Sequence, residues 1–115
     1  MSSVNLVPAE PLSQVVFVHD YVQLVFQAES FSLFNRLRVT SSARTATQGE
    51  TEFPGLLVAL IGQQVTRVAE GSVAMLELHF QDGTSVQVLR GEEFAAGPEA
   101  FMFAGDGDVL VVEQN

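Results

Sequence analysis

The clearest hydrophobic pattern in the chain is a pair of alternating apolar runs joined across Asp82-Gly83, a dipeptide typical of β-hairpin turns. A two-residue loop would pair Leu78 with Gln87 and so mix core positions with solvent positions. A three-residue loop instead pairs Leu78 with Val86. That register puts Gly83 in the left-handed position of a G1 bulge, which glycine adopts readily. We therefore predict a bulged hairpin with one buried face.

Two earlier runs, residues 15–26 and residues 31–39, also alternate between apolar and other side chains. Pairing Phe26 with Phe31 across a four-residue loop brings the apolar positions of both runs onto one face. The two runs are therefore predicted to form an antiparallel pair. A shorter loop would give the same distribution of side chains between the two faces.

That register predicts a buried polar pair, because Asp20 and Asn35 fall on the apolar face as diagonal neighbours. An unpaired buried carboxylate is costly, so either the two side chains bond each other or a bulge at residues 19–20 turns Asp20 outward.

The opposite face of the same strands gathers scarce positive charge around one aromatic ring, at His19, Tyr21, Arg36 and Arg38. These four residues are the candidates for binding a carboxylate or an acidic side chain of a partner. The alternative is an ordinary solvent-exposed face with cross-strand cation–π pairs.

The rest of the chain predicts further short elements within one domain, residues 1–115. They are an extended arm over residues 1–14, a mobile loop over 40–52, a short helix near 54–62, a strand over 64–70 beside the Asp82-Gly83 hairpin, and a last hairpin over 101–112. The predicted fold is mainly β with a minor α+β character. It is a single antiparallel sandwich, roll or partly open barrel of about six to eight strands with one short helix.

The composition indicates a chain that buries much apolar surface. Hydrophobic residues make up 47% of the 115 positions. Such a chain either packs a dense core or covers part of its surface with a partner, and a homodimer is one way to do so.

The charge is acidic and unevenly distributed. Residues 1–69 carry five acidic and four basic side chains, whereas residues 70–115 carry nine acidic side chains and one arginine, within a total net charge of −9. This sign disfavours binding to nucleic acid. It allows the acidic C-terminal half to meet a basic surface of a protein partner, although solubility alone also explains it.

Residue types that carry common chemistry are scarce or dispersed. The chain has no cysteine, and neither a signal peptide nor a run of about 20 apolar residues is visible, so we expect a cytoplasmic protein outside the membrane. His19 and His79 lie in no spaced ligand motif, and we expect no metal and no cofactor. His19 and Asp20 are neighbours on a predicted strand, where their side chains point to opposite faces, so we expect no catalytic dyad.

The segment from Ile61-Gly62-Gln63 and Val65 through Leu76-x-Leu-x-Phe80 to Asp82-Gly83 resembles a family of small uncharacterised bacterial β-rich domains. Some members of that family are similar to immunity proteins of toxin systems. The matching positions are core and turn residues, with Gln64 inserted before Val65. The resemblance implies a bacterial β-rich fold and an immunity-type interaction.

These observations favour a non-enzymatic protein-interaction or binding module. The alternative is a small-ligand binder or an enzyme whose pocket lies inside the sheet, near Asp20, Asn35 and the 40–52 loop.

Overall fold

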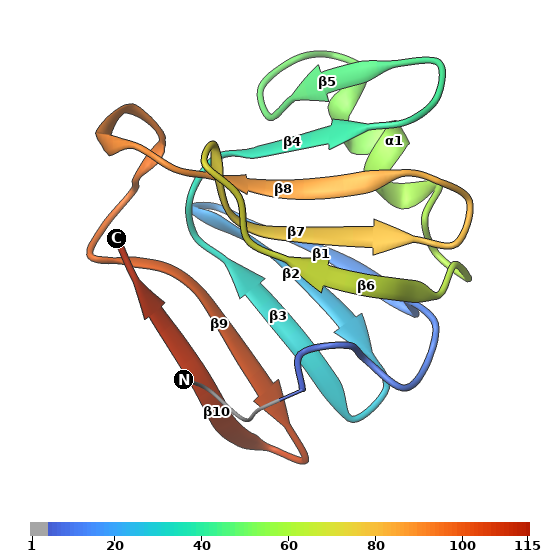
Figure 1. Ribbon diagram of the computed structural model, residues 1–115, viewed down its shortest axis with the longest axis vertical. Helices are drawn as coiled ribbons and strands as arrows, with labels where there is room; N and C mark the ends of the chain where they lie inside the picture. The colour runs from blue at the N-terminus through green and yellow to red at the C-terminus, as the bar shows by residue number, and fades with distance from the viewer. Residues whose placement is uncertain (1–4) are drawn as a thin grey trace.

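The computed structural model describes residues 5–115 and contains two antiparallel sheets of five strands each, packed face to face (Figure 1). Sheet I has the order β1 (Gln14–Val18), β2 (Tyr21–Phe26), β3 (Glu29–Leu33), β9 (Glu99–Gly105) and β10 (Asp108–Gln114). Sheet II has the order β5 (Thr45–Thr47), β4 (Leu37–Thr40), β8 (Ser85–Leu89), β7 (Ala74–Phe80) and β6 (Val65–Ala69). A short helix, α1 (Phe53–Val58), and a 3₁₀ turn, η1 (Glu92–Phe94), complete the structure. The predicted antiparallel β sandwich is confirmed.

The strands are more numerous than predicted because two long runs are divided. A turn at His19 and Asp20 separates β1 from β2. Residues 34–36 carry the chain from sheet I to sheet II, so the run 31–39 contributes to both sheets. Part of the predicted 40–52 loop forms the edge strand β5, which pairs with β4 and buries Ala46.

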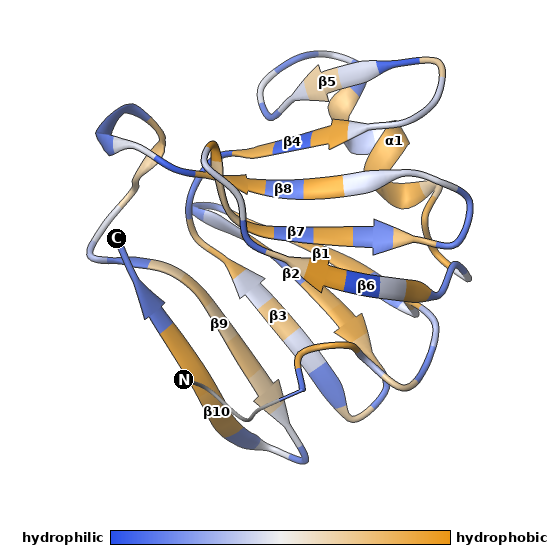
Figure 2. Cartoon of the chain, viewed as in Figure 1, coloured by the Kyte–Doolittle hydropathy of each residue, from blue (hydrophilic) through white to orange (hydrophobic). Residues whose placement is uncertain are grey.

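The core is a layer of alternate side chains from the facing sides of both sheets. Phenylalanines occupy its centre, where the ring of Phe31 lies 4.8 Å from that of Phe103 and 6.2 Å from that of Phe26, measured between centroids. Each ring that is fully buried contributes about 1.5–3 kcal/mol to stability. Hydrophobic and polar residues alternate along many of the strands, and the turns are mostly polar (Figure 2). The hydrophobic side chains of the inward faces form the core.

The Asp82-Gly83 hairpin has the predicted register. Leu78 lies opposite Val86, and the Phe80 amide donates to the Thr84 carbonyl at 2.8 Å across a three-residue loop. Gly83 has φ of +91°, as the bulge requires. The predicted strand beside this hairpin is β6, which pairs with β7.

The predicted register between the second and third strands is wrong. Phe26 lies opposite Glu29 and not opposite Phe31, because the turn contains only Gln27 and Ala28. Gln27 takes the left-handed conformation, with φ of +63°, and the Asp106 amide donates to the Ala28 carbonyl at 2.9 Å. The turn is therefore tightened by the neighbouring hairpin, which a local reading of the sequence does not include. The core face is unchanged, since the shift is by two residues.

The helix is shorter than the predicted 54–62 segment. After α1 the chain continues in tighter turns to Gly62, which has φ of +93° and donates its amide to the Leu12 carbonyl. Leu12 is buried, and its own amide donates to the Gln63 carbonyl. The predicted arm is thus anchored at its C-terminal end, while its residues 1–4 lie outside the described residues.

Asn35 holds together the crossing between the sheets. It is 1% exposed, and its Nδ2 donates to the Leu89 carbonyl at 2.9 Å and to Asn115 Oδ1 at 2.7 Å. Asn115 Nδ2 donates back to Asn35 Oδ1 and to the Gly97 carbonyl. Both amide hydrogens of Asn35 are therefore used, and one side chain links the ends of strands from both sheets.

Removing this amide pair should destabilise the fold. We expect Asn35→Ala to lower the free energy of unfolding by about 1–3 kcal/mol, because it leaves buried polar partners unsatisfied. Asn115→Ala should cost less, and the double variant should cost less than the sum of the two single changes. Urea unfolding of the four proteins measures these differences. Strict additivity would show that the two side chains are not coupled.

Candidate functional site

The four residues predicted to form one binding face are divided between two regions. Arg38 lies on the outer face of sheet II, where its Nε donates to Gln87 Oε1 at 2.8 Å. Tyr21 packs on Phe34, with ring centroids 5.4 Å apart. His19 and Arg36 are both exposed and line one hollow at the end of the sandwich. The predicted single face is therefore wrong, because the chain leaves sheet I after Leu33, before Arg36 and Arg38 can pair with the second strand.

The hollow shared by His19 and Arg36, which we call the end pocket, has a volume of about 270 Å³. Three connections build it: the β1–β2 turn, the β3–β4 crossing and the segment around η1, with the β5–α1 loop at the rim. Its lining residues are His19, Asp20, Phe34, Arg36, Gln48, Gly49, Glu93, Phe94, Ala95 and Ala96.

Backbone contacts fix the position of Arg36 while its guanidinium stays unengaged. The Arg36 amide donates to the Phe94 carbonyl at 2.8 Å, and the Leu89 amide donates to the Arg36 carbonyl at 3.0 Å. Within residues 5–115 no side chain or carbonyl accepts a hydrogen bond from the guanidinium, although Asp20 and Glu93 line the same pocket. The pocket therefore combines a guanidinium with no partner among residues 5–115, a neighbouring imidazole at His19 and the aromatic rings of Phe34 and Phe94.

The predicted pair of Asp20 and Asn35 does not form. Asp20 is exposed in the β1–β2 turn, and Asn35 is buried against Asn115. Alternation along a continuous strand would bury Asp20, but the chain reverses direction at that residue. The pocket expected near Asp20 and the 40–52 loop is present at the surface and not inside the sheet. Asp20 lines the end pocket together with Gln48 and Gly49, whereas Asn35 does not line it.

Within residues 5–115, neither a His19–Asp20 dyad nor a group of metal-ligating side chains is assembled. No hydrogen bond joins His19 to Asp20 within residues 5–115. Over the same range, no three His, Asp or Glu side chains are grouped so that they could hold a metal ion. Within residues 5–115, no helix combines the length and the apolar character needed to cross a bilayer.

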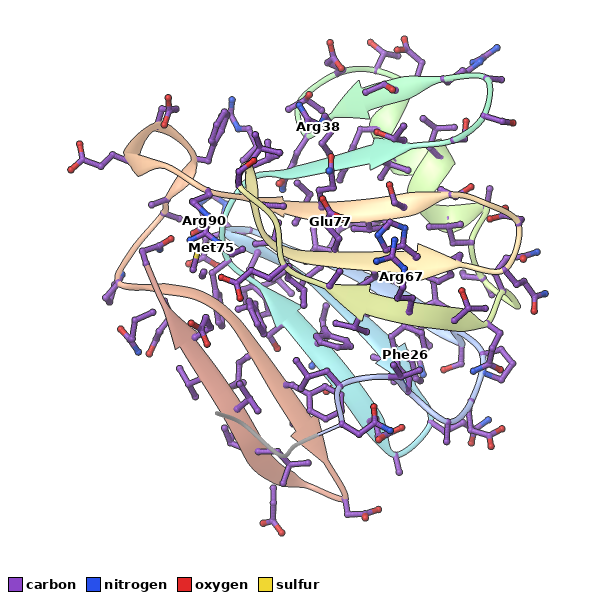
Figure 3. The ribbon with its side chains drawn as sticks, viewed as in Figure 1. Phe26, Arg38, Arg67, Met75, Glu77 and Arg90 are labelled. Carbon is purple, nitrogen blue, oxygen red and sulfur yellow. The ribbon has the colours of Figure 1, made fainter. Side chains whose placement is uncertain are left out.

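The outer face of sheet II carries a hydrogen-bonded row across four strands, which we call the polar row: Arg38, Gln87, Glu77, His79 and Arg67 (Figure 3). Gln87 Nε2 donates to Glu77 Oε2 at 2.9 Å. His79 Nε2 lies 3.1 Å from Glu77 Oε1 and 3.2 Å from an Arg67 Nη atom. This nitrogen either donates to Glu77 or accepts from Arg67, but it cannot do both at once.

Glu77 is held in its charged form by the polar row. The hydrogen bond from Gln87 lowers the pKa of Glu77 most, and the hydrogen bond and charge of His79 and the charge of Arg67 lower it further, against the opposing effect of burial. The Glu77 side chain is only 20% exposed. The Glu77 carboxylate therefore receives its hydrogen bonds from other members of the polar row. The groups of this row have fewer hydrogen-bonding positions left for a ligand than Arg36 has.

A second hollow, of about 400 Å³, is lined by Met75, Arg90 and residues 113–115. Figure 3 labels Met75 and Arg90. This hollow is larger than the end pocket, but its cation is already engaged. Arg90 Nη2 contacts Glu70 Oε2 at 2.9 Å and the carbonyls of Gly71 and Ala74 at 3.2 and 3.3 Å. We therefore regard the end pocket as the stronger candidate site.

Sequence reasoning found His19, Asp20 and Arg36 but missed the residues that complete both sites. Glu77 and His79 alternate with the buried Leu76, Leu78 and Phe80 and therefore lie on an outward face. Their partners Gln87 and Arg67 could be found only from the strand order of sheet II. No sequence signal marks Phe94 or Glu93, which reach the end pocket through the backbone contact of Phe94 with Arg36.

No protein-family model, no curated protein and no solved structure matches this chain.

The pKa of Glu77 tests the polar row. We expect Gln87→Met to raise the pKa of Glu77, because the hydrogen bond that lowers it most is lost. Since the folded-state pKa is lowered, Glu77 contributes stability above its unfolded pKa and loses that contribution as the pH falls through the folded-state pKa. The part of the stability difference between wild type and variant that comes from Glu77 should therefore vanish in acid.

Carboxyl carbon shifts in an NMR titration report this pKa directly. Gln81→Met, in an exposed turn, serves as the control and should leave the titration of Glu77 unchanged. An unaltered pKa in Gln87→Met would show that Gln87 does not stabilise the carboxylate.

Proposed function

We propose that this chain is a non-enzymatic protein-interaction module that receives an acidic side chain of a partner in the end pocket. The observation that carries the proposal is the Arg36 guanidinium, which lines the pocket without a partner among residues 5–115. A carboxylate can accept two parallel hydrogen bonds from such a group.

The other lining residues support a peptide ligand more than a free anion. Asp20 and Glu93 would repel an isolated anion, but they can accept hydrogen bonds from the backbone N–H groups that flank an acidic side chain. Phe34 and Phe94 supply apolar contact for the methylene group of that side chain. The volume of about 270 Å³ suits a ligand group of about one residue.

A basic partner bound by the acidic C-terminal half, as in an immunity-type protein, is supported less directly. The carboxylates of residues 70–115 occupy separate places: Glu77 lies in the polar row, Glu113 at the second hollow, and Asp106 and Asp108 at the β9–β10 turn. We therefore assign the proposed binding to the end pocket. The bacterial source and the cytoplasmic location are parts of this proposal that derive from the sequence alone.

Titration with a minimal ligand tests the end pocket. N-acetyl-aspartate N-methylamide should shift the amide NMR signals of residues 19–20, 34–36 and 93–96. The neutral asparagine analogue should bind at least about tenfold more weakly, because it lacks the charge that meets Arg36. Equal binding of the two compounds would overturn the proposal.

Variants of arginine separate the pocket from general charge effects. Arg36→Ala should weaken binding at least about tenfold, and Arg36→Lys should lie between it and wild type because it keeps the charge but not the planar fork. Arg44→Ala removes an equally exposed arginine from the β4–β5 connection and should have no effect. A matching loss in Arg44→Ala would show a nonspecific charge effect.

A further inference from the structure

The outer face of sheet I carries no charged residue. Its positions follow from the pairing of the five strands, because partners in an antiparallel pair share a face. They include Val16, Val18 and Val25 on β1 and β2, and Met102, Val109 and Val112 on β9 and β10. The charged residues of these strands, such as Glu29 and Glu113, lie opposite inward-facing Phe26 and Phe101 at the margins of the sheet.

The uncharged outer face of sheet I contrasts with the rest of the molecule. The chain has a net charge of −9, and the outer face of sheet II carries the charged polar row. The apolar side chains of sheet I are open to solvent at both edges. Val18 on β1 is 38% exposed, and Val109 and Val112 on β10 are 56% and 41% exposed. The central strands present small, partly exposed side chains, including Ser30 and Ala104, which permit close approach of another sheet.

We propose that two copies of this chain associate through the outer faces of sheet I. Two chains of charge −9 repel each other, and this face lets them meet without bringing carboxylates together. At about 4.8 Å between strands and about 3.3 Å per residue, five strands cover roughly 480 Å² on each copy. The total of roughly 1,000 Å² reaches the size at which specific interfaces begin. The arrangement is isologous, because the same face serves both copies.

Sedimentation velocity over the micromolar to sub-millimolar range measures this association. Wild type should form a dimer, and the dimer should strengthen with added salt, since salt screens the repulsion between two acidic copies. An interface held by opposite charges would weaken instead. A monomer throughout the range, or a dimer that dissociates in salt, would overturn the proposal.

Charge substitutions locate the interface. Val18→Glu and Val112→Glu each place a carboxylate on the face and should raise the dimer dissociation constant at least about tenfold. Both positions are exposed, so the subunit should keep its fold, which circular dichroism verifies. Thr47→Glu, on the outward side of β5, is the matched control and should dimerise like wild type. A dimer that survives both valine substitutions, or that is lost in Thr47→Glu, would place the interface elsewhere and refute this assignment.

Discussion

The fold depends on the burial of alternate side chains between two sheets that each have one apolar face. Phe31 illustrates the constraint: it is fully buried, it contacts phenylalanines from three other positions, and its strand pairs on both sides. Because burying a large ring is worth about 1.5–3 kcal/mol, register shifts by one residue are excluded, while shifts by two keep the same face inside. The predicted and the observed β2–β3 registers differ by two residues, and both therefore keep Phe31 on the core face.

The two outer faces are released from this constraint and differ in chemistry. Sheet II uses its outer face for a hydrogen-bonded row centred on Glu77, whose charge is compensated by neighbours on adjoining strands. Sheet I leaves its outer face uncharged, with its most exposed apolar side chains at the two edges. Edge strands and apolar faces of this kind are regions through which β proteins associate.

The end pocket arises where connections from several parts of the chain meet. Asn35 is central to this arrangement, because its side chain links the end of β8 to Asn115. The next residue, Arg36, lines the pocket. The site is thus supported by a buried amide network adjacent to it. The ionisable groups of the end pocket lie in connections between strands. They therefore do not take part in cross-strand hydrogen bonds like those that Arg38 and Glu77 make with Gln87.

Local pattern determined a large part of this structure. The parity of Leu76, Leu78 and Phe80 with Val86 and Val88 predicted the bulged hairpin and its buried face, because side-chain alternation and the needs of Gly83 are properties of the segment itself. Tertiary structure decided where the chain reverses and changes sheet. The crossing at residues 34–36 has hydrogen-bond partners as distant in sequence as Asn115 and Phe94. No local alternation contains those contacts. The crossing and the turn at His19-Asp20 bring His19 and Arg36 into one pocket, and the crossing places Arg38 on the other sheet.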